Sequence, residues 1–132
     1  MEELLGAEAY RRLIAPATKL MGRPPGDATA FVRKYSPSTR PRLAFHVDGC
    51  DASISVNLAV DDYVGADLLL LADRSVLAAP RAVGDAATHD ADVAHAVSDI
   101  TSGVRWSLVV FCHKSKSWRN SARINENGRY HS

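Results

Sequence analysis

The sequence is poor in the features that define several large classes of protein. Only two cysteines are present, Cys50 and Cys112, and no CxxC pair occurs, which excludes a disulfide scaffold and the common zinc motifs. The N-terminal letters MEELL lack the basic and apolar regions of a signal peptide, and no apolar run approaches the length of a membrane span. We therefore expect a soluble protein of a reducing compartment, with the cytoplasm favoured. The net charge of +1 gives no global field toward nucleic acid or a membrane surface, so neither is expected as a partner.

The length and composition are those of one globular domain. With 132 residues, of which 46% are hydrophobic and 23% charged, the chain can bury a core, although a barrel of this size is close to minimal. Charge is unevenly spread, because the segment 113–132 carries five lysines and arginines against a single acidic residue, Glu126. We predict a single domain over residues 1–132 that ends in a polar, basic tail over residues 113–132.

Patterns typical of strands outnumber patterns typical of helices. Apolar residues at roughly helical spacing predict one helix over residues 2–21, which Pro16 is expected to kink or split. Strands are predicted over the ranges 28–35, 42–48, 52–60, 68–71, 84–89, 93–97 and 104–112. Residues 61–66 and 101–103 are interpreted as turns, and residues 73–83, which lack clear periodicity, as a loop. Short strands with frequent turns behind one helix favour a mainly β sandwich or barrel.

Two of the predicted strands alternate between residue types, so each has two distinct faces. In the strand 52–60 the polar face carries Ser53, Ser55 and Asn57. This face either turns to water or points into a pocket, which Ser55 and Asn57 could then line. In the strand 104–112 one face carries Arg105, Ser107, Val109 and Phe111. The opposite face carries Val104, Trp106, Leu108 and Val110. We expect Trp106 to pack in the core, together with Cys112 at the end of the strand.

A His-x-Asp pair lies at the end of the second predicted strand. Side chains at positions i and i+2 leave the same face of a strand, so His46 and Asp48 are expected to point the same way. Imidazole and carboxylate groups form the facial triad of non-haem Fe(II) sites, which leaves positions open for substrate and oxygen. A third ligand must be His, Asp or Glu, and the candidates between residues 84 and 99 are His89, Asp90, Asp92, His95 and Asp99.

Arg105 is the second candidate functional residue, because it lies within an otherwise apolar strand. A guanidinium is costly to bury unless it meets an anion. Ser107 shares its face, and an arginine with a nearby hydroxyl can jointly hold a carboxylate. The alternatives are a structural ion pair with an internal acidic residue and an exposed position on an edge strand.

Taken in order, these residues resemble the core of an Fe(II)- and 2-oxoglutarate-dependent dioxygenase, closest to the prolyl 4-hydroxylase-like branch. The likeness spans about residues 29–112 and includes His46-Val47-Asp48, Gly65 before an apolar strand, Gly84-Asp85-Ala86, His95 and the run TSGVRWSL over 101–108. It implies a double-stranded β-helix (jelly-roll) core with one N-terminal helix. The chain departs from the family at residues 65–68, where a paired glycine is common, and in having few elements before the His-x-Asp strand.

The resemblance assigns roles to individual residues. The iron ligands it implies are His46, Asp48 and His95. His95 is preferred over His89 because its distance to Arg105 along the chain fits the family. Arg105 matches the basic residue that binds the distal carboxylate of 2-oxoglutarate, with Ser107 as a helper. Tyr35 matches a position where the family often has a tyrosine facing the co-substrate.

The resemblance also implies an activity. A substrate, for which a prolyl residue of a peptide or protein is the leading candidate, would be hydroxylated at the expense of O2 and 2-oxoglutarate, with release of succinate and CO2. The cofactor is Fe(II), and ascorbate is left open as a further one.

Two other functional classes fit the same residues. One is an inactive or metal-binding jelly-roll module that works by interaction, which the short N-terminal region favours. The other is a cupin-type hydrolase or isomerase, in which the three ligands hold zinc or manganese and Arg105 binds an anionic substrate.

Overall fold

The N-terminal segment forms two helices, α1 (Glu2–Leu5) and α2 (Ala7–Met21). The break falls at Gly6, whose φ of +82° suits glycine, and α2 continues through Pro16. Of the kink or split expected at Pro16, the split is therefore wrong. Proline removes a single backbone donor there, while Ile14 and Ala17 on either side are buried, so packing outweighs the local loss. The helix ends at Gly22, whose amide donates to the Thr18 carbonyl at 3.0 Å.

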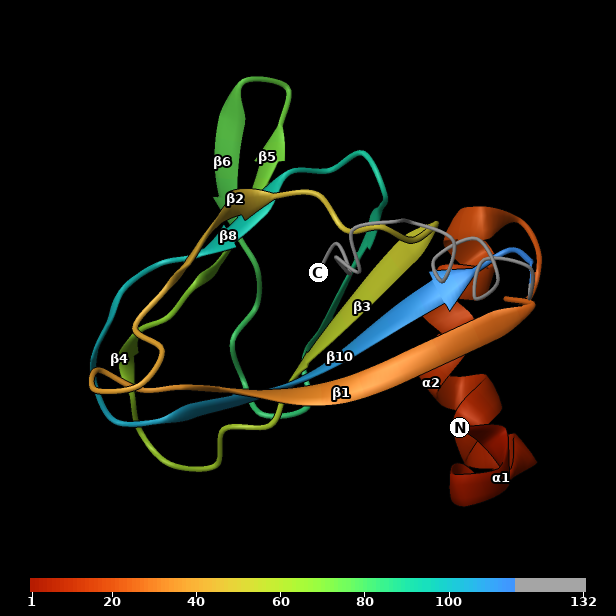
Figure 1. Ribbon diagram of the computed structural model, residues 1–132, viewed down its shortest axis with the longest axis horizontal. Coiled ribbons are helices and arrows are strands. Elements are labelled where there is room, and N and C mark those ends of the chain that lie inside the picture. Colours follow the sequence, from red (N-terminus) through yellow and green to blue (C-terminus); the bar gives the residue numbers. More distant parts are fainter. Residues whose placement is uncertain (116–132) are drawn as a thin grey trace, which may run out of the picture.

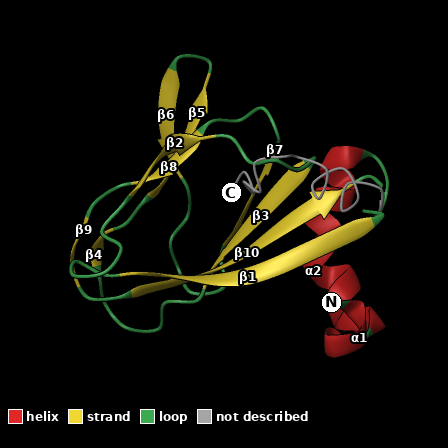
Figure 2. Cartoon of the chain, in the orientation of Figure 1, coloured by secondary structure: helices red, strands yellow, loops and turns green. Residues whose placement is uncertain are grey.

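The computed structural model describes residues 1–115, in which strands are the main regular structure (Figures 1 and 2). The strands are β1 (Asp27–Tyr35), β2 (Leu43–His46), β3 (Ala52–Asn57), β4 (Val64–Gly65), β5 (Leu68–Ala72), β6 (Ser75–Ala78), β7 (Ala86–Asp90), β8 (His95–Val97), β9 (Ile100–Ser102) and β10 (Arg105–His113). Each predicted strand has a counterpart. The part of the predicted tail beyond residue 115 lies outside the described residues.

The strands form two four-stranded antiparallel sheets and one short ladder. The larger sheet has the order β1-β10-β3-β7, and the smaller has the order β2-β8-β5-β6. The two-stranded ladder β4-β9 lies at one end (Figure 2). The chain passes back and forth between the two four-stranded sheets from β1 to β10, so each sheet is built from segments distant in sequence. This arrangement is the predicted jelly roll.

Helix α2 covers the outer face of the larger sheet (Figure 1). The buried cluster between them is rich in small side chains, which allow close approach: Ala17, Ala28, Ala52, Ile54, Val110 and Cys112. The expectation for Cys112 is confirmed, since it is fully buried. The expectation for Trp106 is wrong, because 44% of this residue is exposed. It packs under the Lys34 ammonium, 5.4 Å from its ring, at a part of the outer face that α2 does not cover.

Three short strands, β4, β6 and β9, were not predicted from the sequence pattern. The predicted loop 73–83 contains β6, which forms a hairpin with β5 through a two-residue turn at Asp73 and Arg74. Both turn residues have positive φ, 45° and 67°, as the favoured two-residue hairpin turns require. Asp-Arg is not a usual sequence for that turn, so the hairpin carried no local signal. Strand β4 and two of the three residues of β9 lie in the regions interpreted as turns.

Neither helix in residues 1–115 combines the length and the apolar character needed to cross a membrane.

Gly65 supports a specific prediction, because a side chain at this position would collide with backbone. A Cβ on Gly65 would lie 1.9 Å from the Asp99 carbonyl oxygen, whereas a Cβ on Gly84 would have no atom within 4 Å. Both glycines have a similar positive φ, +82° and +86°. We expect Gly84→Ala to cost about 1 kcal/mol of unfolding free energy through backbone strain alone. Gly65→Ala should cost about 3 kcal/mol or more, up to failure to fold. Chemical denaturation checks this, and equal losses in the two variants would contradict it.

Candidate metal centre and adjoining pocket

The polar face of β3 points between the two sheets. Ser53 and Asn57 are each only 2% exposed, and Ser107, which lies opposite Asn57 on β10, is equally buried. Of the two orientations that the alternation in β3 allowed, the structure therefore has the one that faces a pocket, which Ser53 and Ser55 line, while Asn57 is buried beside it. Burying hydroxyl and amide groups in this way is costly unless they have partners, and each has one: Ser53 donates to Asp48, Ser55 pairs with Ser107 at 3.0 Å, and Asn57 donates to the Tyr63 hydroxyl at 3.2 Å.

Three potential metal ligands converge at one end of this pocket. His46 ends β2, Asp48 follows two residues later, and His95 begins β8 directly opposite His46 in the ladder. The Nε2 atoms of His46 and His95 lie 3.3 Å from the two carboxylate oxygens of Asp48. The ligand atoms of the three residues all lie within 4.8 Å of one another. His46 and Asp48 point the same way as predicted, although β2 stops at His46 and Asp48 belongs to the loop beyond it.

Backbone carbonyls orient both imidazoles. The Nδ1 atom of His46 lies 2.8 Å from the Ala44 carbonyl oxygen, and the Nδ1 atom of His95 lies 3.1 Å from that of Val93. When each Nδ1 carries the proton that it donates to a carbonyl, each Nε2 turns a lone pair toward Asp48. Two lone pairs and a carboxylate then face one another, an arrangement that needs a cation between them. The donor set therefore fits a divalent metal of the type that imidazole and carboxylate ligands favour.

Charge and hydrogen bonding lower the pKa of Asp48 and raise the pKa of His95. Burial alone would raise the pKa of Asp48, but hydrogen bonds from His95 and Ser53 and the nearby imidazoles outweigh it and lower this pKa below its ordinary value. Burial alone would lower the pKa of His95, but its hydrogen bond with Asp48 outweighs that and raises it. Asp48 is thus ionised at neutral pH and attracts positive charge, whether a proton on His95 or a metal ion.

His89 lies beside this group without joining it. Its ring centre is 4.3 Å from that of His95, it is buried, and its Nδ1 contacts the Asp90 carbonyl at 3.0 Å. It projects from β7 in the larger sheet, across from Ser53, and not from the smaller sheet that carries His46 and His95. Burial lowers the pKa of His89, so this imidazole stays neutral. The geometry favours His95 over His89 as the third ligand, the choice that the resemblance made.

Arg105 closes the other end of the pocket. It is 5% exposed, and its Nη1 donates to the Ala66 carbonyl at 3.0 Å and its Nε to the Asn57 amide oxygen at 3.5 Å. No acidic side chain within residues 1–115 forms an ion pair or hydrogen bond with it, and it is not on an exposed edge, so both alternative interpretations of Arg105 fail. Burial lowers the pKa of its guanidinium. Several of its N–H groups remain for an anion in the pocket.

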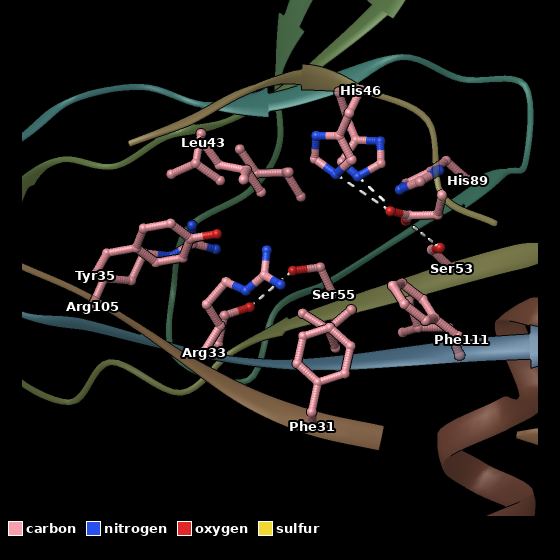
Figure 3. Close-up of a pocket in the computed structure, with 17 residues that line it drawn as sticks. Phe31, Arg33, Tyr35, Leu43, His46, Ser53, Ser55, His89, Arg105 and Phe111 are labelled. Carbon is pink, nitrogen blue, oxygen red and sulfur yellow. Dashed lines mark hydrogen bonds and ion pairs between the residues drawn. The ribbon is translucent and has the colours of Figure 1, made fainter. Parts of the chain in front are cut away.

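The pocket extends from the three potential metal ligands to Arg105 and is lined by residues of both sheets (Figure 3). Its charged lining residues are Arg33, Asp48 and Arg105. Tyr35, which is 2% exposed, lies beneath the Arg105 guanidinium, 5.9 Å from ring centre to Cζ. Its apolar lining residues are Phe31, Leu43, Ile54, Leu68, Val97, Val109 and Phe111. The predicted residues Tyr35, His46, Asp48, His95, Arg105 and Ser107 all line this one pocket.

Two lining residues were not assigned from the sequence. Ser53 donates to Asp48 Oδ2 at 2.6 Å and so links the metal centre to the larger sheet. Arg33 projects into the pocket from β1. A signal for Arg33 existed, because it stands two residues before Tyr35 on the same strand and must share its face. Ser53 had a similar signal for its face, because it stands two residues before Ser55, but its partner Asp48 could not be foreseen, since that contact depends on how the loop after β2 returns.

Comparison with known proteins supports the fold. No protein-family model matches the chain, and no curated protein matches it in sequence. A solved prolyl-4-hydroxylase from Pseudomonas putida superposes with a TM-score of 0.66 at 18% identity, over 80% of this chain and 62% of that one. A 2OG-Fe(II) oxygenase family oxidoreductase from Burkholderia pseudomallei gives 0.67 at 17%, over 84% and 53%. The chain thus spans less than two thirds of the length of either structure. Similarity at this identity concerns the fold, and it confirms at that level the resemblance to prolyl 4-hydroxylase-like oxygenases.

The hydrogen bond between Ser53 and Asp48 generates a prediction about metal affinity. In Ser53→Ala the carboxylate loses the donor that orients it, so we expect Fe(II) or Mn(II) affinity to fall about 10- to 100-fold. Ser55→Ala is the matched control, because this hydroxyl lies two residues along the same strand and contacts Ser107 instead. Its metal affinity should stay near that of the unaltered protein. Titration with Mn(II), followed by electron paramagnetic resonance, measures both; a similar decrease in the two variants would contradict the assignment.

Proposed function

We propose that this protein is an Fe(II)- and 2-oxoglutarate-dependent dioxygenase that hydroxylates an organic substrate. The observation that carries the proposal is a pocket with two complementary ends. One end holds three converging ligands, and the other holds a buried guanidinium without an acidic partner in the described chain. A metal-chelating molecule that also bears a distal carboxylate satisfies both ends at once, and 2-oxoglutarate is such a molecule.

The metal would be held by His46, Asp48 and His95. Their ligand atoms converge at one end of the pocket, and a metal held by these three residues would have further positions left for substrate and oxygen. When bound, Fe(II) and 2-oxoglutarate supply the oxidising chemistry, in which O2 and 2-oxoglutarate are consumed, succinate and CO2 are released, and one oxygen atom enters the substrate as hydroxyl. The side chains themselves orient the reactants and exclude water.

The distal carboxylate of 2-oxoglutarate would bind Arg105. A guanidinium binds a carboxylate through paired, charge-assisted hydrogen bonds, and such a pair offsets the cost of burying Arg105. Ser107 can add a hydroxyl donor from the same strand face. Tyr35 holds the guanidinium from below and completes that end of the pocket. Between the two polar ends, Phe31, Val109 and the other apolar lining residues would contact the methylene groups.

A prolyl residue in a peptide is the leading candidate for the hydroxylated group. It is supported by the fold shared with the Pseudomonas prolyl-4-hydroxylase. Ascorbate is proposed as an additional reductant, and its effect on turnover is tested by adding it to the assay after the metal and co-substrate sites are established.

The metal ligands are tested by spectroscopy without turnover. Under anaerobic conditions, addition of Fe(II) and then 2-oxoglutarate should produce the visible charge-transfer band of a chelated keto acid. We expect His95→Ala to abolish this band and His89→Ala to retain it, because His89 lies outside the converging group. A band lost in His89→Ala and kept in His95→Ala would reverse the assignment. No band in folded, unaltered protein would favour a non-catalytic interaction module.

The role of Arg105 is tested by co-substrate affinity. Arg105→Ala removes a charge-assisted pair worth about 1.5–3 kcal/mol, so we expect 2-oxoglutarate affinity to fall about 10- to 100-fold while Fe(II) affinity is retained. The charge-transfer titration measures the first quantity, and the metal titration measures the second. Arg42→Ala, which removes an exposed arginine paired with Asp99, is the control. Unchanged 2-oxoglutarate affinity in Arg105→Ala would remove Arg105 from the site.

A further inference from the structure

We propose that Arg33 binds an anionic group, a carboxylate or a phosphate, on the molecule that is hydroxylated. The primary substrate would then be restricted to compounds that carry such a group close to the reacting carbon. This inference rests on the proposed dioxygenase function and deepens it, because it names a substrate class and the residue that selects it.

The position of Arg33 on β1 directs its side chain into the pocket. It shares one face of the strand with Phe31 and Tyr35, which also line the pocket. In the β1-β10 ladder it lies opposite Ser107. Its neighbour Lys34 points to the outer face, where its ammonium lies over Trp106. Figure 3 shows Arg33 reaching from β1 toward the middle of the pocket. The guanidinium therefore stands between the metal centre and the Arg105 end.

Arg33 has no anionic partner in the described chain. Within residues 1–115 no hydrogen bond or ion pair holds its guanidinium, and its one specific contact is with the Phe31 ring, whose centre is 5.1 Å from Cζ. Arginine stacks well on an aromatic face while keeping its N–H edge available for an oxyanion. A half-buried guanidinium supported in this way is oriented for a ligand.

The charge of the pocket leaves room for one more anion. Asp48 is the only acidic side chain among its lining residues, against Arg33 and Arg105. With a divalent metal on the triad and doubly charged 2-oxoglutarate in place, one positive charge stays uncompensated. The co-substrate would already use the metal and Arg105, so the uncompensated charge belongs to Arg33. An anionic group of the primary substrate neutralises it.

A second, shallow hollow gives this anion a route of entry. It is lined by Phe31, Val32, Arg33, Lys34, Thr39 and Arg40, so it contains three basic residues and no acidic one. Arg33 borders both this hollow and the pocket. β1 is an edge strand of the larger sheet, so a ligand can approach across it. Clefts lined by one sign of charge attract ligands of the opposite sign.

The experiment uses matched probes that differ in charge. Protein loaded with Mn(II) and 2-oxoglutarate, without oxygen, is mixed with N-acetyl-L-proline or its neutral amide, and separately with glycerol 3-phosphate or glycerol. Broadening of the probe's proton signals by Mn(II) reports binding beside the metal and needs no turnover. We expect at least one charged probe to be broadened about 10-fold more than its neutral counterpart at equal concentration. The carboxylate and phosphate arms tell which oxyanion is preferred.

Variants tie that preference to Arg33. Arg33→Met should abolish the preference for the charged probe and change 2-oxoglutarate affinity less than about 3-fold, and Arg33→Lys should restore part of the preference. Arg12→Met, which removes an exposed arginine of α2, makes the same change in net charge and should behave like the unaltered protein.

Three results would overturn the inference. Equal broadening, or none, of charged and neutral probes in protein that binds 2-oxoglutarate rejects it while leaving the dioxygenase proposal intact. A loss of 2-oxoglutarate affinity in Arg33→Met as large as that in Arg105→Ala assigns Arg33 to the co-substrate instead. Failure of folded, unaltered protein to bind 2-oxoglutarate at all rejects the dioxygenase proposal, and this inference with it.

Discussion

The buried carboxylate of Asp48 connects the two sheets on which the structure is built. Its oxygens contact His46 and His95 from the smaller sheet and accept a hydrogen bond from Ser53 of the larger one. An ionised carboxylate is costly to bury unless every oxygen has a partner. Here the contacts come from β2, β3 and β8, so the surroundings of this carboxylate are complete only when both sheets are in place. The residues that could bind a metal thus also connect the two sheets.

The interior of the molecule has two different halves. Between α2 and the larger sheet lies a dry cluster of small and aliphatic residues, centred on Ile54 and Val110. On the other side of the same sheet, β3 and β10 present Ser55, Arg105 and Ser107 to the pocket. Because side chains alternate along β3 and β10, one face of these strands packs against α2 and the other lines the pocket. Helix α2 supports the pocket from behind and contributes nothing to its lining.

The two proposals place three charges along one pocket. The triad and Arg105 would hold the ends of 2-oxoglutarate, and Arg33 would hold the primary substrate between them, at the side open to β1. Arg33 and Arg105 are two positions apart along the paired strands β1 and β10, so about 6.8 Å of strand separates the two proposed binding positions. It also makes the co-substrate and the primary substrate electrostatically dependent on each other, because each neutralises charge that the other would otherwise meet.

The sequence by itself determined the mainly β fold, each of the longer strands and which side chains share a strand face, because successive side chains of a strand alternate between its two sides. Residues that depend on local pattern, such as His46, Asp48 and Arg105, were therefore accessible, whereas the choice of His95 and the assignment of Tyr35 came from the resemblance to the dioxygenase family. Tertiary structure alone decided the rest. Whether the serines of β3 meet water or the pocket, whether Trp106 is covered, and whether Ser53 reaches Asp48 all depend on where α2 and the smaller sheet lie. The β5-β6 hairpin and the β4-β9 ladder are too short to leave a periodic signal, and they form because neighbouring backbone groups need partners. Sequence pattern specifies the faces of each strand, whereas only packing specifies what each face meets.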